Sequence, residues 1–155
     1  MFSSRLIDNI LVLVLSVAFS FISTSGYLVL WGVKPNLILS LIIASIFLRA
    51  SSFTIVLLVV LSAAALAWTP SLSFSLFVLP LLAAAGLIAR RVFSPRLASV
   101  FSISFIATFI WYFASDFDFA VNFVPTVFLE GIINGILSVA LTATGRTLKV
   151  FDYYA

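Results

Sequence analysis

The sequence predicts an all-α integral membrane protein, with residues 1–155 forming a single domain of six transmembrane helices. The first observation behind this prediction is composition: 64% of the residues are hydrophobic and only 8% are charged, and the mean hydropathy is +1.33. A soluble domain of this length has too small an interior to bury so much apolar surface. The second observation is that the basic residues fall in alternate gaps between long apolar runs, which is typical of loops on one side of a membrane.

The apolar runs define six predicted segments: residues 10–30, 35–52, 53–68, 72–89, 97–114 and 123–144. As helices they would be about 24–33 Å long, close to the roughly 30 Å of a bilayer's hydrocarbon core. The second segment is the shortest in strictly apolar residues, because Leu37 to Leu48 spans only about 18 Å before Arg49. A re-entrant hairpin of the second and third segments is the alternative to two full spans.

The first segment has some features of a signal peptide, since Arg5 precedes its apolar stretch and small residues occupy positions 23–25. Hydrophobicity resumes at once through residues 27–31, however, and an Ala-x-Ala cleavage site is absent. We therefore expect an uncleaved helix. The third and fourth segments carry clusters of small residues at 62–67 and 83–89, which favour close helix packing in lipid.

The positions of the charges predict the orientation of the segments. If all six segments span, seven of the eight basic residues lie on one side: Arg5, Arg49, Arg90, Arg91, Arg96, Arg146 and Lys149. Only Lys34 lies on the other side. The positive-inside rule then places both termini in the cytoplasm, and the re-entrant alternative preserves the same arrangement of the remaining loops.

The gap at residues 115–122 is predicted to be an outer loop in which Asp116 and Asp118 alternate with phenylalanines. The aromatic rings suit an interfacial anchor, which we favour, or contact with a partner.

The last segment contains Glu130, the only acidic residue inside an apolar run. On a helix, Glu130, Asn134 and Ser138 form one polar stripe, and Gly131 and Gly135 lie beside it as a Gly-x-x-x-Gly pair. Carboxylates inside a membrane are costly, so this face is expected to point at other helices. It serves either as a packing seam, which we favour, or as a polar site for a substrate or proton. The glycine pair suits a contact within one chain or between copies of a homo-oligomer.

Several classes of function are disfavoured by what the chain lacks. It contains no cysteine and no histidine, which are the usual ligands of zinc, haem and iron–sulfur clusters. Phosphate-binding loops, catalytic triads and paired carboxylates are not recognisable. The basic residues are dispersed over separate loops rather than gathered on one face, which argues against nucleic acid. We expect a protein that is not an enzyme, takes no metal or cofactor, and contacts membrane lipid.

One stretch resembles a known family. The second helix is opened by the stretch Gly32, Val33, Lys34, Pro35, Asn36, Leu37, Ile38 and Leu39. This stretch is similar to the Gly-Val-x-Pro-(Asp/Asn)-Leu pattern of the rod-shape-determining MreD family. Chain length and the closing segment, with Pro125 and Glu130, also look like that family. The family's late third-helix aspartate is missing, since residues 62–70 read SAAALAWTP, so the chain resembles a divergent member.

The resemblance implies a scaffold of the cell-shape and elongation machinery in the bacterial inner (cytoplasmic) membrane, with MreC-like bitopic and peptidoglycan-synthesis proteins as partners. It implies a fold like that of the substrate-binding subunits of energy-coupling-factor transporters. A vitamin-binding subunit of that type is the alternative function. The residues expected to contact partners or pack helices are Gly32, Lys34, Pro35, Asn36, Asp116, Asp118, Glu130, Gly131, Asn134 and Gly135.

Overall fold

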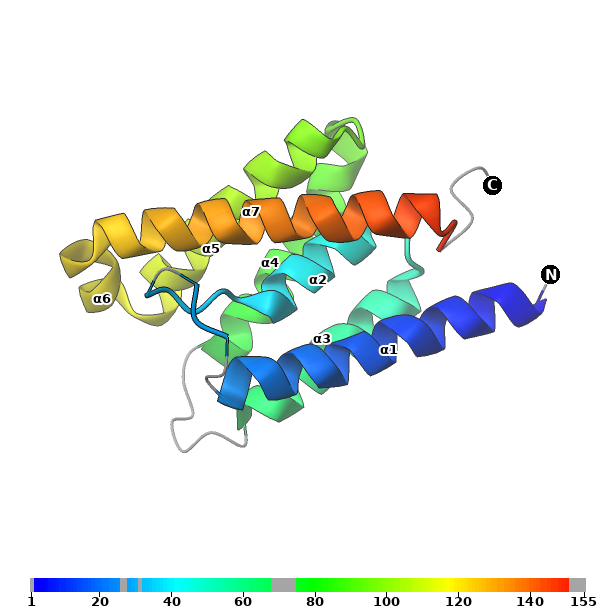
Figure 1. The fold of residues 1–155 in the computed structure, drawn as a ribbon, viewed down its shortest axis with the longest axis horizontal. Coiled ribbons are helices and arrows are strands. Elements are labelled where there is room, and N and C mark those ends of the chain that lie inside the picture. Colours follow the sequence, from blue (N-terminus) through cyan, green and yellow to red (C-terminus); the bar gives the residue numbers. More distant parts are fainter. Residues whose placement is uncertain (1, 26–27, 31, 68–74, 151–155) are drawn as a thin grey trace.

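The computed structural model describes residues 2–25, 28–30, 32–67 and 75–150. Within these ranges the structure is helical apart from turns and one isolated β-bridge, so the predicted all-α class is confirmed for the described residues. The helices are α1 (Phe2–Ser25), α2 (Leu37–Phe47), α3 (Ser52–Ala67), α4 (Ser75–Val92), α5 (Leu97–Ser115), α6 (Phe117–Asn122) and α7 (Val124–Thr147) (Figure 1).

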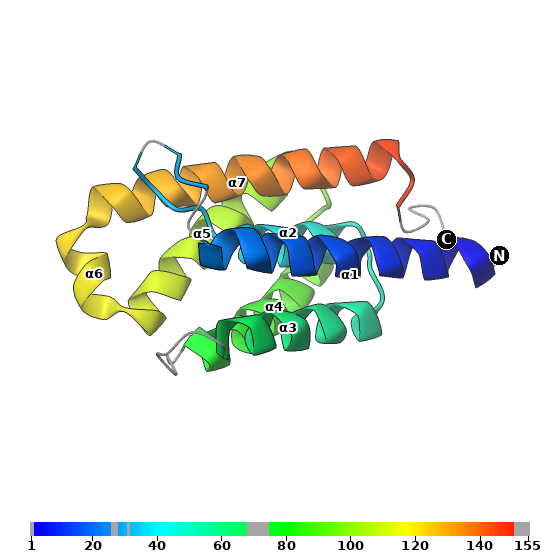
Figure 2. The ribbon, with the colours of Figure 1, turned by 60° about the horizontal axis from the view of Figure 1, so that its bottom comes forward.

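The short helix α2 is the centre of the bundle. It packs against α1, α3, α4, α5 and α7, and in Figures 1 and 2 it lies between the long helices α1 and α7. All eleven of its residues are buried. A sequence that is apolar on every side, with mostly isoleucine and leucine, is what such an enclosed helix requires. The hydrophobic core accordingly gathers around α2, with Leu39, Ile46 and Phe47 almost fully buried.

Local signals fix both ends of α2. At its start, the Asn36 side chain accepts a hydrogen bond from the Leu39 backbone N–H at 3.0 Å, an N-cap. At its end, Arg49 has a φ of 60°, and the Ala50 N–H donates to the Ser45 carbonyl at 3.0 Å. These bonds form a left-handed C-cap of the Schellman type. The helix therefore stops after about 16 Å.

The end of α7 repeats that arrangement. Lys149 has a φ of 52°, and the Val150 N–H donates to the Gly145 carbonyl at 2.8 Å. Arg49 and Lys149 are the non-glycine residues with positive φ in the described part of the chain. Each places a cation beside the carbonyl end of a helix, which the helix dipole favours.

The predicted segments and the observed helices differ in three respects. The second segment, expected at residues 35–52, contains a helix of only eleven residues, because the Arg49 cap ends it. The expected loop at 115–122 contains α6, which the Asp116 side chain caps by accepting from the Phe119 N–H at 3.1 Å. The first segment, expected at 10–30, is a helix that starts earlier and ends at Ser25. Residues 68–74, where the third segment was to end and the fourth to begin, lie outside the described residues.

Two of the described helices, α5 and α7, are long and apolar enough to cross a membrane. The apolar stretches Asn9–Ser23, Leu37–Phe47 and Ser52–Ala64 are shorter. Buried helices of soluble proteins also meet a criterion of length and composition. The helical structure is thus weakly consistent with a membrane protein, and the predicted six-span bundle is not confirmed.

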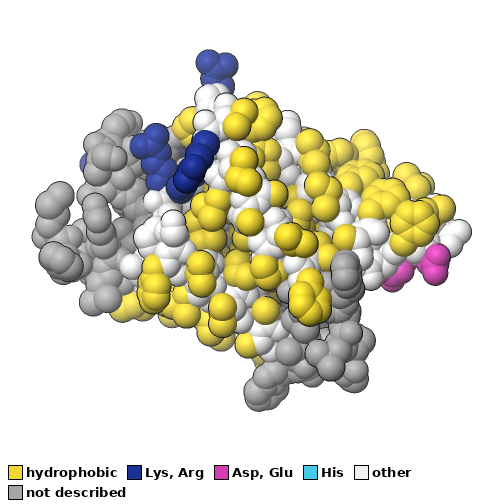
Figure 3. Space-filling view, turned by 180° about the vertical axis from the view of Figure 1, so that it is seen from behind, with side chains coloured by type: hydrophobic (Ala, Val, Ile, Leu, Met, Phe, Trp, Pro, Cys, Tyr) yellow, Lys and Arg dark blue, Asp and Glu magenta, His cyan; other side chains and the backbone are white. Residues whose placement is uncertain are grey.

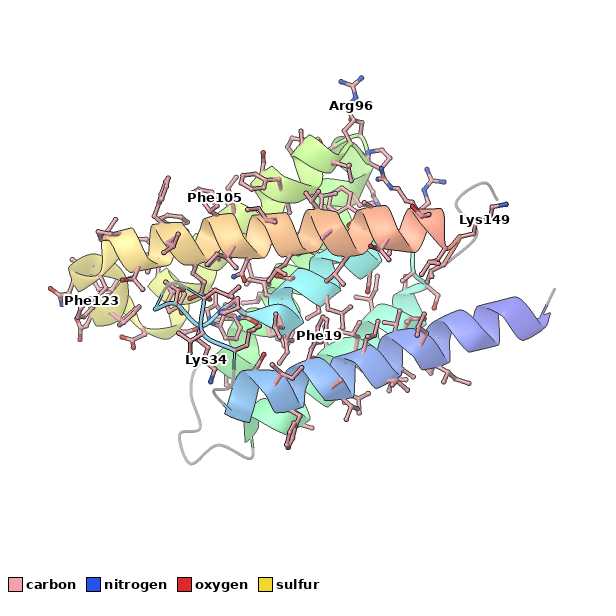
Figure 4. All side chains as sticks on the ribbon, viewed as in Figure 1. Phe19, Lys34, Arg96, Phe105, Phe123 and Lys149 are labelled. Carbon is pink, nitrogen blue, oxygen red and sulfur yellow. The ribbon has the colours of Figure 1, made fainter. Side chains whose placement is uncertain are left out.

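The exposed charged side chains that the structure describes lie at the two ends of the bundle. In Figure 4, Arg96 and Lys149 lie toward the end where α1 begins and α7 finishes, whereas Lys34 and Phe123 lie toward the other end. Figure 3 shows the same separation, with lysine and arginine toward one end of that face and acidic side chains at the opposite end. We call these the basic end and the α6 end.

Candidate functional site

A chain of buried polar side chains joins α2, α5 and α7, and we call it the polar seam. It consists of Ser40 from α2, Ser104, Thr108 and Tyr112 from α5, and Glu130, Asn134 and Ser138 from α7. Except for the half-buried Tyr112, every member is at most 2% exposed. Buried polar groups require hydrogen-bond partners, and here the neighbouring helix supplies most of them.

Glu130 receives hydrogen bonds from three elements. The Tyr112 hydroxyl donates to its Oε2, and the Asn134 Nδ2 approaches its Oε1 at 3.5 Å. The backbone amide of Asn36, at the start of α2, also hydrogen-bonds the carboxyl. The carboxyl is therefore held by donors from inside the same chain.

Asn134 links the middle of the seam. Its Nδ2 donates to the Thr108 hydroxyl at 3.0 Å, and its backbone carbonyl accepts from Ser104 at 3.1 Å and from Ser40 at 3.3 Å. The Ser104 and Ser138 hydroxyls are 2.8 Å apart. These bonds cross between helices, so they fix the rotation of α5 and α7 about their axes.

Gly131 and Gly135 allow α5 and α7 to approach closely. A Cβ at Gly135 would lie 2.7 Å from the ring of Phe101, and one at Gly131 would lie 2.9 Å from the ring of Phe105. Figure 4 shows Phe105 beside α7. The Gly-x-x-x-Gly pair therefore packs against aromatic rings of its own chain.

The candidate residues at 32–36 lie partly at the surface and partly in the interior. Gly32 has a φ of 80° and forms the turn in which Leu30 and Val33 exchange hydrogen bonds of 2.8 and 2.9 Å. Lys34 is exposed, whereas Pro35 is buried. Asn36 joins the Glu130 cluster through its backbone, so two candidates that are far apart in the sequence meet in the structure.

Asp116 and Asp118 are exposed at the α6 end. Asp116 caps α6, and Asp118 lies in its first turn, where acidic residues are favourable. Beside them the apolar side chains of Phe117 and Val121 are 62% and 50% exposed. This acidic and aromatic surface adjoins the Tyr112 end of the polar seam, since the Asp116 N–H donates to the Tyr112 carbonyl at 2.8 Å and the Tyr112 ring stacks on Phe119.

The α5 half of the seam and Ser40 of α2 were not predicted from the sequence. Ser104, Thr108 and Tyr112 are spaced four residues apart, as are Glu130, Asn134 and Ser138 on α7. This spacing places them on one face of a helix and could have identified them from the sequence. Tyr112 was not predicted because a tyrosine in an apolar run carries no charge that would distinguish it, as the carboxylate does Glu130.

The basic end also has internal contacts. The Arg90 Nη1 donates to the Ile46 carbonyl at 3.3 Å, and the Arg146 Nη2 donates to the Pro95 carbonyl. The charges of Arg49 and Arg91 act on Arg90, so these cations lie close together. Among the described residues, no group of three histidine, cysteine or acidic side chains is placed to hold a metal ion.

Comparisons with protein-family models, with curated proteins and with solved structures found no match to this chain. The resemblance to the MreD family therefore rests on the residues of the sequence.

We expect Tyr112→Phe to lower the free energy of unfolding by about 1–3 kcal/mol, because the buried Glu130 carboxyl loses a donor. In a Glu130→Leu background the same change should have almost no cost, which gives a coupling energy of about 1–3 kcal/mol. Chemical unfolding of the purified protein measures both. Phe113→Leu, at an exposed neighbouring position, is the control. Equal costs in the two backgrounds would show that the pair contributes nothing.

Gly135→Val should destabilise the protein by about 1–3 kcal/mol through overpacking against Phe101. Adding Phe101→Ala should recover part of the loss, since it removes the ring that the new side chain meets. Ala140→Val, on the exposed side of the same helix, is the matched control. Thermal unfolding and light scattering report stability and oligomeric state. A loss of oligomers without a loss of stability would place the contact between chains instead.

Proposed function

We propose that the chain is a multi-pass protein of the bacterial cytoplasmic membrane with both termini cytoplasmic. Its role is to act as a non-enzymatic scaffold of the cell-elongation machinery. The partners of this scaffold are an MreC-like bitopic protein and proteins of peptidoglycan synthesis.

The proposal of a membrane location is supported by large apolar side chains that are exposed along the sides of the bundle. Phe53, Phe77 and Leu81 are 73%, 68% and 66% exposed, and Phe21 and Ile88 are similar. Water-soluble proteins rarely expose so many large apolar side chains. The charges lie at the two ends of the bundle, where an embedded bundle meets headgroups and water.

The observation that carries the scaffold proposal is the contrast between the polar seam and the α6 end. Most of the seam's polar groups are paired with one another, which favours helix packing over transport or catalysis. At the α6 end, by contrast, Asp116, Asp118, Phe117 and Val121 remain exposed. Aromatic side chains mixed with charge are common where proteins bind one another.

The elongation role comes from the resemblance at residues 32–37. Gly32 has a positive φ and Asn36 caps α2, so the pattern's glycine and its Asp/Asn position both have structural uses here. The proposed orientation places the α6 end outside, where a bitopic partner has its extracytoplasmic region.

The orientation is testable because the chain has no cysteine, so each introduced cysteine is unique. We expect a membrane-impermeant maleimide to label Lys34→Cys and Asp118→Cys in intact spheroplasts. Arg96→Cys and Lys149→Cys should react only after permeabilisation, because they lie at the basic end. If only Arg96→Cys and Lys149→Cys are labelled in intact spheroplasts, the orientation is the reverse of the proposed one. Labelling of all four cysteines in intact spheroplasts would exclude a spanning arrangement.

The partner is testable by affinity purification of the full chain from native membranes in mild detergent, followed by mass spectrometry. We expect a single-span protein with an extracytoplasmic coiled coil, together with wall-synthesis enzymes. Replacing the exposed Phe117 and Val121 by alanine should reduce their recovery at least tenfold, because such aromatic anchors dominate interface energies.

The matched control is Phe53→Ala with Val56→Ala, which removes the same two residue types from exposed positions on α3 and should leave recovery unchanged. Recovery of a transmembrane coupling subunit with paired ATPases would overturn the scaffold and favour the vitamin-binding alternative.

A further inference from the structure

An open groove runs between α4 and α5 on the outside of the bundle. Its volume is about 440 Å³, within the range of roughly 300–1,000 Å³ for small-molecule sites. Ile43 of the central helix α2 contributes to its lining, together with Ala85 and Ala89 from α4 and Ser102 and Ile106 from α5. Most of the lining is apolar.

Small side chains explain why the groove exists. Ala85, Gly86 and Ala89 follow one face of α4, and a Cβ at Gly86 would lie 2.8 Å from the Ile46 side chain. This contact seats α4 directly on α2, and the missing side-chain volume leaves the space open beside α5. Ala85, Ser102 and Ile106 are exposed there.

One end of the groove lies at the connection between α4 and α5, where arginines neighbour its lining residues in the sequence. The lining includes Ala89, Phe93 and Ala98, and these residues alternate along the chain with Arg90, Arg91 and Arg96. Arg90 is engaged with the Ile46 carbonyl, whereas Arg91 and Arg96 are exposed. An apolar groove with cations near one end is complementary to a molecule that has an apolar tail and an anionic head.

We propose that this groove binds an anionic phospholipid, with one acyl chain lying between α4 and α5 and the headgroup phosphate at Arg91 and Arg96. Basic sites between helices on the cytoplasmic side of a membrane are suited to anionic headgroups. The inference rests on the proposed membrane location and on the cytoplasmic position of the basic end. It does not depend on the elongation role.

A lipid chain fits this groove better than a partner helix does. An α-helix with its side chains is about 10–12 Å across, whereas α4 and α5 contact each other and are joined by the short connection at residues 93–96. An acyl chain is much thinner and can reach the floor at Ile43. The positive charge at only one end also suits a lipid, which carries its charge at one end.

Native mass spectrometry of the full chain in detergent tests the proposal, with phosphatidylglycerol and phosphatidylcholine of identical acyl chains as probes. We expect retained adducts of phosphatidylglycerol at concentrations where phosphatidylcholine leaves none. Arg91→Gln with Arg96→Gln should weaken phosphatidylglycerol binding about 30-fold, at about fivefold per arginine, and abolish the preference between the two lipids.

Ala85→Leu should fill the groove and reduce adducts at least tenfold while both arginines remain. Ala84→Leu, on the exposed side of the same helix and outside the groove, is the matched control and should bind as the parent does. Unfolding temperatures of all variants, measured in the same detergent, exclude loss of fold as the cause of lost adducts.

Equal retention of the two lipids by the parent protein would overturn the inference. So would lipid adducts that survive Ala85→Leu, with or without a dimer that disappears in that variant. Loss of a dimer with Ala85→Leu, while the lipid adducts persist, would assign the groove to a second copy of the chain. Carbonate extraction of native membranes tests the membrane location separately. A chain that resists extraction but retains no phosphatidylglycerol would refute the lipid site alone.

Discussion

The polar seam between α2, α5 and α7 is the constraint on which the rest of the bundle depends. Polar groups buried in an apolar interior are costly unless they pair, and pairing requires each donor to face its acceptor. The Asn134 and Glu130 contacts therefore determine how α5 and α7 are rotated and how deep α2 lies between them. Apolar packing alone would leave many near-equivalent arrangements, since leucine and isoleucine side chains interlock in many registers.

The sequence predicted the helical class correctly, because composition and the length of apolar runs determine it. It also placed Glu130, Asn134 and Ser138 on one face of one helix, which follows from the 3.6-residue period. It did not identify Tyr112 as the partner of Glu130. That pairing depends on the rotation of α5 relative to α7, which is a property of the assembled bundle and not of either segment.

Two local elements escaped prediction for related reasons. The sequence shows that the strictly apolar part of the second segment is short and ends before Arg49. It does not show how the helix ends, because the cap places Arg49 in a left-handed conformation, which arginine seldom adopts. The helix α6 was expected to be a loop, because alternation of aspartate and phenylalanine does not have a helical period. Asp116 nevertheless caps a short helix there, because its side chain accepts from the backbone N–H three residues further on.

Arg49 and Lys149 each have two roles: the residue forms the turn that ends a helix, and it carries a positive charge. Each backbone turn is of a kind that glycine would make more easily, yet each position carries a cation. The two helix ends are close together, since Gly145 of α7 packs against Leu48. In a membrane protein, glycine at either position would preserve the turn but remove a positive charge that helps to orient the chain. Under the proposed membrane orientation, a mutation at either residue to any other uncharged residue would therefore change the end of a helix and the direction of insertion together.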